Sequence, residues 1–249
     1  MHYVISDLHG CYSTYKKLLK KIRFSDKDTL YVLGDIFDRG MNPMSILLDM
    51  MKRKNVIPLL GNHEHMGLPI LQFAHKCLLN KTSAESNRNY VDRQLYRNAE
   101  DLYNCWCHNG GGITLYDFVA REPEERQKIL NYVSTFKPYY EVRVNGRDFV
   151  LVHAGIPHNE FMESKPLREY SVEALVWERI EITDEYYKKK ILIVGHTPTH
   201  FIHEANPGKI FTVGNNIDID CGCYYGYNLG AYCMETGEEF YVRASEEDI

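Results

Sequence analysis

The stretch Gly34-Asp35-Ile36-Phe37-Asp38-Arg39-Gly40 places two carboxylates and a guanidinium within one short turn. It follows the apolar run 29–33, so it lies where a buried strand is expected to end. Asp35 could hold a cation, Asp38 could orient a proton donor, and Arg39 could bind an oxyanion. For this stretch alone, a polar loop with a surface salt bridge is the plainer alternative.

Four other apolar runs end in a similar way. The five runs lie near residues 3–6, 29–33, 56–60, 149–152 and 191–194, and each ends within three residues of an aspartate, histidine or asparagine. In open α/β sheets, ligands bind beyond the carboxyl ends of the strands. We therefore predict that six side chains from distant parts of the chain meet at one site: Asp7, His9, Asp35, Asn62, His153 and His196.

These side chains suit divalent metal ions, because they offer carboxylate, imidazole and amide oxygen ligands and no thiolate. One ion cannot use six such groups and keep positions open for substrate and water, whereas two ions that share a carboxylate can. Asp35 is the expected bridge because its strand should lie between the two other early strands. For a single histidine of the set, a buried and hydrogen-bonded side chain is the alternative. We assign Asp7, His9 and Asp35 to the first ion, and Asp35, Asn62, His153 and His196 to the second.

The order of the motifs resembles the calcineurin-like metallophosphoesterases, and within them the small bacterial and phage members of the phosphoprotein phosphatase branch. The resemblance covers residues 4 to about 235. It implies an α/β fold of four layers, with a central β-sandwich of two mixed sheets flanked by helices. It also implies two divalent metal ions, with manganese first and iron or zinc as alternatives. The motifs are Asp7-x-His9, Gly34-Asp35-x-x-Asp38-Arg39-Gly40, Gly61-Asn62-His63-Glu64, His153-Ala154-Gly155 and Gly195-His196.

One position departs from the broader superfamily. Many members continue Gly-His-x-His, and the last histidine completes the first metal site. Here that position is Pro198, with His200 two residues later. The phosphoprotein phosphatase branch also lacks this histidine, so the first ion is expected to have three protein ligands and additional water.

The expected nucleophile is a hydroxide held between the two ions, since two cations lower the pKa of water between them. His63, which directly follows Asn62, is the expected acid for the leaving oxygen, and Asp38 is expected to orient its imidazole. Glu64 and His65 are interpreted as structural neighbours.

Arg39 and Arg179 are expected to bind the phosphate oxygens, with Asn62 as a further substrate contact. Arg179 is chosen because Val176-Trp177-x-Arg179 is similar to the phage-type enzymes. An arginine on a helix surface is the alternative for it.

The preferred function is a phosphomonoester hydrolase that acts on phosphoserine or phosphothreonine in proteins, with phosphotyrosine as a further substrate. A symmetrical bis(5'-nucleosyl)-tetraphosphate hydrolase is the alternative. Those relatives commonly lack the aspartate that matches Asp38 and carry Gly-Asn-His-Asp where this chain has Glu64. A third hypothesis is a non-catalytic phosphate-binding module, which the complete ligand set disfavours.

The elements that must position these residues begin as β-α-β-α-β, the pattern of a parallel sheet. Ser13 is the expected N-cap of the first helix. Residues 65–138 do not continue this alternation and are interpreted as a mostly helical insertion within a single domain 1–249. Helices are expected near 68–79, 91–106 and 123–134, with the polar stretch 81–89 between the first two. A hairpin with an Asn145-Gly146 turn follows, and the chain beyond Gly195 is expected to be antiparallel.

Composition restricts the remaining possibilities. The net charge of -5 argues against a nucleic-acid partner. A strand almost at residue 1 and the lack of a long apolar run predict a cytoplasmic protein with no membrane partner. Seven cysteines are expected to be reduced. Cys105-Trp106-Cys107 and Cys221-Gly222-Cys223 could form a zinc site, but their one-residue spacing favours small buried thiols.

Overall fold

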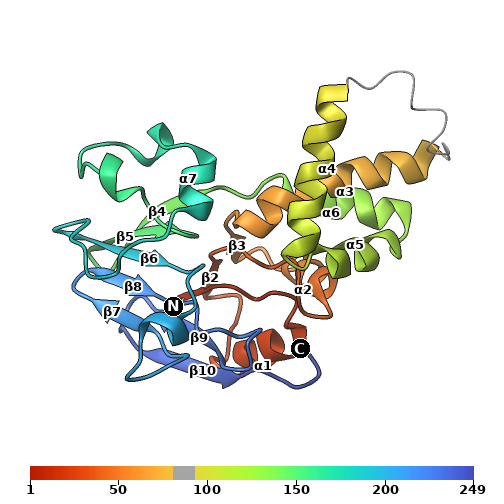
Figure 1. Ribbon diagram of the computed structural model, residues 1–249. Helices are drawn as coiled ribbons and strands as arrows, with labels where there is room; N and C mark the ends of the chain where they lie inside the picture. Colours follow the sequence, from red (N-terminus) through yellow and green to blue (C-terminus); the bar gives the residue numbers. More distant parts are fainter. Residues whose placement is uncertain (81–92) are drawn as a thin grey trace.

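The computed structural model describes residues 1–80 and 93–249, and it contains two five-stranded mixed sheets (Figure 1). In the first sheet the strand order is β10-β9-β1-β2-β3, and β1, β2 and β3 are parallel to one another. The predicted central position of the second strand is therefore correct. The strands of this sheet are β1 (His2–Ile5), β2 (Thr29–Val32), β3 (Val56–Pro58), β9 (Asn228–Cys233) and β10 (Glu239–Arg243).

The second sheet has the order β4-β5-β6-β8-β7. The hairpin between β4 and β5 has the predicted turn, with φ of 48° at Asn145 and 79° at Gly146, as a type I′ turn requires. The strands after Gly195 pair antiparallel with one another, as predicted, in the pairs β7–β8 and β9–β10. The exception is the other edge of β8, which pairs parallel with the earlier strand β6. The strands are β4 (Tyr139–Val144), β5 (Arg147–Val152), β6 (Lys190–Val194), β7 (Phe211–Val213) and β8 (Asn216–Asp218).

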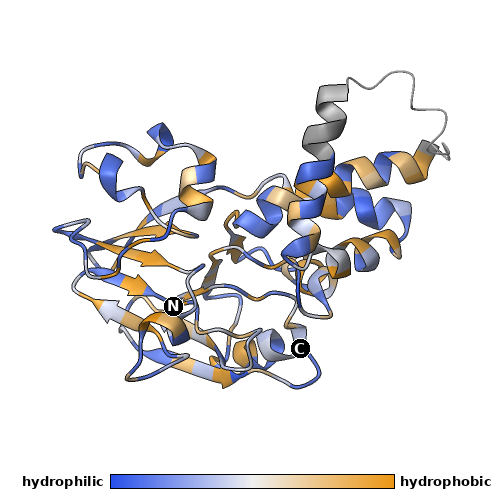
Figure 2. Ribbon diagram, viewed as in Figure 1, coloured by the Kyte–Doolittle hydropathy of each residue, from blue (hydrophilic) through white to orange (hydrophobic). Residues whose placement is uncertain are grey.

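Three clusters of buried side chains separate four layers, which agrees with the predicted fold class. The middle cluster joins the two sheets through side chains such as Val4, Leu33 and Ile193. A second cluster joins the first sheet to the helices that cover it, and a third joins the other sheet to the segment around α7 (Val172–Trp177). Several strands accordingly carry long orange segments in Figure 2, with blue and white residues between them in others. Apolar area removed from water in these three interfaces is the main driving force that holds the layers together.

The helices lie on the outside of the sandwich. Six helices of the described chain cover the first sheet: α1 (Tyr12–Lys21), α2 (Pro43–Met51), α3 (Asn62–Asn80), α4 (Arg93–His108), α5 (Gly111–Val119) and α6 (Pro123–Val133). Three further short elements that the structure describes lie near the second sheet: η1 (His158–Glu160), η2 (Leu167–Glu169) and α8 (Thr199–Ile202). The predicted insertion corresponds to α3–α6, which stand together beyond β3 in Figure 1.

The insertion differs from its prediction at its start. The first helix begins at Asn62 rather than near Leu68, so the motif Asn62-His63-Glu64 forms its first turn. The apolar period of the later residues could not show this, because the first turn carries polar side chains that face the site. The predicted polar stretch 81–89, and the first residues of the helix predicted at 91–106, lie outside the described residues. Across residues 1–80 and 93–249 no helix has both the length and the apolar character needed to cross a bilayer.

The N-terminus of α1 is capped by a distant residue. Ser13 was predicted as the N-cap, but the helix begins at Tyr12, and Asp248 accepts the N–H groups of Ser13 (2.9 Å) and Thr14 (2.8 Å). Asp248 also accepts the Thr14 hydroxyl (2.6 Å) and is buried. Helix N-termini leave N–H groups without an intrahelical partner. A carboxylate from 234 residues away therefore does what a local cap does elsewhere.

We predict that Asp248→Ala lowers the free energy of unfolding by about 1–3 kcal/mol, because buried N–H groups lose their acceptor. Urea denaturation followed by far-UV circular dichroism would measure the change. Glu247→Ala, which removes an exposed neighbour, is the control and should leave the midpoint nearly unchanged. Equal stabilities of the Asp248 variant and the wild type would contradict the capping role.

Candidate metal centre

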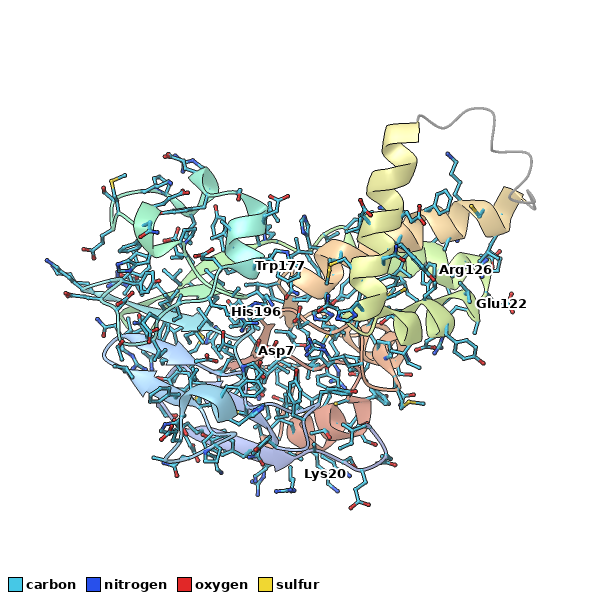
Figure 3. All side chains as sticks on the ribbon, viewed as in Figure 1. Asp7, Lys20, Glu122, Arg126, Trp177 and His196 are labelled. Atoms are coloured by element: carbon cyan, nitrogen blue, oxygen red, sulfur yellow. The ribbon has the colours of Figure 1, made fainter. Side chains whose placement is uncertain are left out.

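The six predicted ligands come together where strands of both sheets end. Asp7 and His9 follow β1, Asp35 follows β2, and Asn62 opens the helix after β3. From the second sheet, His153 follows β5 and His196 follows β6. The backbone N–H of His196 donates to Asp7 Oδ2 over 3.0 Å, although 189 residues separate the two (Figure 3). The predicted convergence of strand ends is thus present in the structure.

Asp35 lies at the centre of this group and is almost completely buried. Its Oδ2 lies 3.6 Å from His9 Nε2 and 3.7 Å from His63 Nε2, and its Oδ1 lies 3.4 Å from His153 Nε2. Two sets of ligating atoms, each within 4.8 Å of one another, share this carboxylate: His9, Asp35 and His63, and Asp35, His153 and His196. One carboxylate that belongs to two sets is the arrangement that a pair of cations requires.

The first set differs from the assignment made from sequence, since it contains His63 in place of Asp7. Asp7 lies beside the set and accepts hydrogen bonds from Ser6 Oγ and from the His196 backbone. Burial is the main reason that the pKa of Asp35 is raised, and the nearby charge of Asp7 raises it further.

Hydrogen bonds to main-chain carbonyls fix two of the imidazoles. Nδ1 of His9 donates to the Phe37 carbonyl (2.9 Å), and Nδ1 of His153 donates to the Leu33 carbonyl (2.6 Å). Because Nδ1 carries the proton, the lone pair of each Nε2 faces the centre of the site, as it does in metal-ligating histidines. Burial, followed by the charge of Arg39, holds the pKa of His9 well below its ordinary value, so this imidazole is neutral and able to ligate.

Asn62 supplies a further indication of a cation. Its Oδ1 lies 3.0 Å from His153 Nε2, the nitrogen that carries no proton when the imidazole is neutral. With Nδ1 of His153 protonated, Nε2 and the Asn62 Oδ1 can both act as electron-pair donors, and a cation near both atoms would satisfy them together. Burial, and then the neighbouring His153, lower the pKa of His196 to about 2, so that imidazole is neutral and able to ligate as well. The donor set therefore fits a divalent cation.

The site contains more buried carboxylate than the sequence analysis found. Asp218 and Asp220 are buried, and burial first, then neighbouring carboxylates, raise the pKa of each well above its ordinary value. Asp7 and Asp35 are among the carboxylates that act on Asp220. The alternation Ile217-Asp218-Ile219-Asp220 was the available signal, since two aspartates in so apolar a run are unusual. Bound cations would reverse these shifts by stabilising the carboxylates in their charged form.

The backbone at the site is held in an uncommon conformation. Six of the predicted site residues have a positive φ: Asp7 (53°), His9 (38°), Asp35 (51°), Asp38 (71°), Arg39 (70°) and His196 (68°). Only two other non-glycine residues of the described chain do so, Arg23 and Asn145. Each such residue costs about 1–2 kcal/mol relative to ordinary backbone. Strain concentrated in this way is typical of functional sites.

His63 and Asp38 form a buried pair beside Asp35. His63 Nδ1 donates to Asp38 Oδ2 over 2.6 Å, so Nε2 of His63 faces the site. Burial alone would lower the pKa of His63, but the carboxylates of Asp35 and Asp38 more than offset it and raise that pKa. Trp106 and Thr114 also donate hydrogen bonds to Asp38, which no pattern in the sequence indicated.

The two predicted arginines lie on different sides of the site. Arg39 donates from Nη1 to His9 Nε2 (2.9 Å) and from Nη2 to His63 Nε2 (3.1 Å). A metal ion on His9 would need the same lone pair, so the two contacts are alternatives. Arg179 is exposed and donates to the His196 carbonyl (3.0 Å) and to Thr197 Oγ1 (2.8 Å), at the rim of the site.

The cysteines of the described residues do not belong to the metal centre. Cys221 and Cys223 are buried, Cys105 is exposed, and all seven are free thiols. Neither of the two ligand sets in the described residues contains a cysteine.

Similarity to known proteins extends over most of the chain. The family model "Calcineurin-like phosphoesterase" matches residues 3–228. "Serine/threonine-protein phosphatase 2" of Salmonella typhimurium is 26% identical over 234 residues, which cover 92% of this chain and 91% of that protein. The symmetrical bis(5'-nucleosyl)-tetraphosphatase of Wigglesworthia glossinidia brevipalpis is 42% identical, but over only 65 residues, 25% of this chain and 24% of that protein.

Among solved structures, a metallophosphoesterase from Sphaerobacter thermophilus superposes with a TM-score of 0.55 at 15% identity, covering 98% of this chain and 87% of that one. At this identity the likeness supports the fold.

We predict that Asp35→Asn weakens binding of Mn²⁺ at least about tenfold, because both ligand sets lose their shared charge. Isothermal titration calorimetry on metal-free protein would measure the affinity. Since burial raises the pKa of Asp35, the wild type should release protons as metal binds, and its affinity should fall as pH is lowered. Asp148→Asn, in an exposed part of the β4–β5 hairpin, is the matched control. Unchanged affinity in the Asp35 variant would exclude this residue as a ligand.

Proposed function

The chain belongs to the calcineurin-like phosphoesterases, hydrolases that act on phosphoric esters, and from this we propose that it is a metal-dependent protein phosphatase. Its substrates would be phosphoserine and phosphothreonine in proteins, with phosphotyrosine as a further one. The observation that carries the proposal is the buried pair His63–Asp38 next to Asp35.

The pair favours a leaving group that needs a proton. An alkoxide that leaves from phosphoserine is strongly basic, since even water has a pKa of about 16. The leaving group of a dinucleoside tetraphosphate is a phosphate oxygen with a pKa of about 6, which departs as an anion at neutral pH. A histidine that a carboxylate holds in place, and whose pKa is raised, is useful mainly for the first reaction.

The proposed metal ligands are His9, Asp35, Asn62, His153 and His196, with Asp7 beside them. Two bound divalent cations would lower the pKa of water to near neutrality and polarise the phosphoryl group. The protein contributes fixed imidazoles, a shared carboxylate and a site largely shielded from solvent. Manganese suits these oxygen and nitrogen donors, and we propose it as the native metal with iron or zinc as alternatives.

Arg39 is proposed to bind the phosphate when it is not bound to the two imidazoles. His63 can carry a proton on Nε2 only if Arg39 no longer donates to that atom. If Arg39 moves away from His9 and His63, Nε2 of His63 becomes free to carry the acid's proton. The same movement makes the planar guanidinium available to bind the phosphate oxygens. Arg179 and Asn62 are proposed as the further substrate contacts, and the contact of Arg179 with the His196 carbonyl at the rim of the site supports its inclusion.

The relatives support the same choice. The Salmonella typhimurium phosphatase matches over nearly the whole of both chains, whereas the tetraphosphatase match covers a quarter of each. That local match at 42% identity keeps a symmetrical bis(5'-nucleosyl)-tetraphosphatase as the second candidate. Two further proposals remain from the sequence: a single domain over 1–249, and a cytoplasmic location without nucleic-acid or membrane partners.

We predict that the Mn²⁺-loaded protein releases phosphate from a phosphoserine peptide faster than it releases ADP from diadenosine tetraphosphate. Malachite-green detection of phosphate and chromatography of nucleotides would measure the two rates. The Asp35→Asn variant, purified in parallel, controls for contaminating phosphatases. A wild type that cleaves only the dinucleotide would overturn the proposal in favour of the second candidate.

We further predict that His63→Asn retains its metals but lowers kcat for the phosphoserine peptide about 10²–10⁴-fold, the range of general-acid catalysis. The loss should be smaller with p-nitrophenyl phosphate, whose leaving group needs little protonation. Metal content by mass spectrometry and kcat for both substrates would be measured. If this substitution removed the metals, His63 would be a ligand, as its distance to Asp35 also permits.

A further inference from the structure

We propose that Trp106 and Thr114, both from the helical insertion, are positioning residues that hold Asp38 in the one orientation in which it can align His63. This inference rests on the proposed function, because it concerns the acid of that reaction. It gives the insertion a role inside the catalytic apparatus, in addition to any contact with substrate.

The carboxylate of Asp38 is fixed at both of its oxygens. Oδ2 accepts His63 Nδ1 (2.6 Å) and Trp106 Nε1 (2.7 Å), and Oδ1 accepts the Thr114 hydroxyl (2.6 Å). The Thr114 Oγ1 in turn accepts the backbone N–H of Asp38 over 2.8 Å. Asp38, Trp106 and Thr114 all have no exposed surface. Rotation of the carboxylate would therefore break at least two buried hydrogen bonds at once, which is costly.

Without these two donors the carboxylate would be poorly determined. An aspartate bound only to His63 could turn about its Cβ–Cγ bond and present either oxygen. Its own backbone, at φ 71°, is in a conformation that side-chain contacts must maintain. The donors come from α4 and α5, 68 and 76 residues further along the chain, so the alignment depends on how the insertion packs.

The surroundings of Trp106 are built to direct its N–H toward Asp38. A side-chain carbon at Gly111 would overlap the indole, and one at Gly67 would lie 3.0 Å from it. Glycines on α3 and α5 therefore leave room for the ring. The neighbouring Gly110 carbonyl accepts the Arg39 N–H over 3.3 Å, so the same corner of the insertion also contacts the next residue of the motif.

Three variants separate positioning from packing. Trp106 would be replaced by β-(3-benzothienyl)alanine, an isostere in which sulfur takes the place of the N–H, by site-specific incorporation. Thr114→Val keeps the shape of the side chain and removes the hydroxyl, and Thr114→Ser is the rescue that restores it. Thermal unfolding and metal content would be measured for each before kinetics.

We expect the isostere and Thr114→Val each to lower kcat for the phosphoserine peptide about 10–100-fold, the usual effect of groups that orient a functional side chain. The loss with p-nitrophenyl phosphate should be several-fold smaller, and Thr114→Ser should recover most of the activity. In a His63→Asn background neither change should lower kcat further, because there is no longer an acid to align.

Equal losses for the two substrates, or losses that persist in the His63→Asn background, would show a merely structural role and overturn the inference. Full activity of both variants, in an enzyme whose wild type shows the His63 effect, would overturn it as well. A wild type without metal-dependent phosphatase activity would instead overturn the proposed function on which the inference rests.

Discussion

The carboxylate of Glu64 holds the two central turns of the site together. It accepts four backbone N–H groups: those of Ile36 (2.8 Å) and Phe37 (2.9 Å) at Oε1, and those of Asp35 (2.9 Å) and Gly61 (3.0 Å) at Oε2. Glu64 lies in the first turn of α3, where the helix macrodipole favours a negative charge. Because one buried carboxylate satisfies N–H groups of both turns, the Asp35 turn keeps its left-handed backbone and its place above the strand ends. The sequence analysis interpreted Glu64 as a structural neighbour, and these contacts agree with that interpretation.

The same region concentrates negative charge in a medium of low polarity. Asp7, Asp35, Asp218 and Asp220 are all buried, and burial of several carboxylates in one place is unfavourable unless cations compensate them. Arg39 is the cation that contacts the imidazoles in this structure. The electrostatics therefore favour binding of positive charge at the site. Part of the backbone strain is the cost of bringing these carboxylates together.

Much of this arrangement could be predicted from the sequence. Apolar runs that end in Asp, His or Asn placed the strand ends correctly, because parallel strands present their carboxyl ends at one edge of a sheet. Contacts across the fold could not be predicted. The cap of α1 is Asp248, because any nearby carboxylate, local or distant, can accept the N–H groups of a helix N-terminus. The cysteines around Trp106 suggested a zinc site, whereas the indole N–H of Trp106 makes the contact with Asp38, and no local pattern shows where a buried N–H points.

The positions of the two tryptophans give the molecule an optical property. Trp106 donates to Asp38, and the ring of Trp177 lies 6.1 Å from that of His196, so both indoles of the chain lie against the site. Their ultraviolet emission therefore originates next to the site, from one buried indole and one that is 40% exposed. Paramagnetic ions such as Mn²⁺ quench nearby fluorophores, so binding of such an ion at the site would lower the intrinsic tryptophan fluorescence of the unlabelled chain.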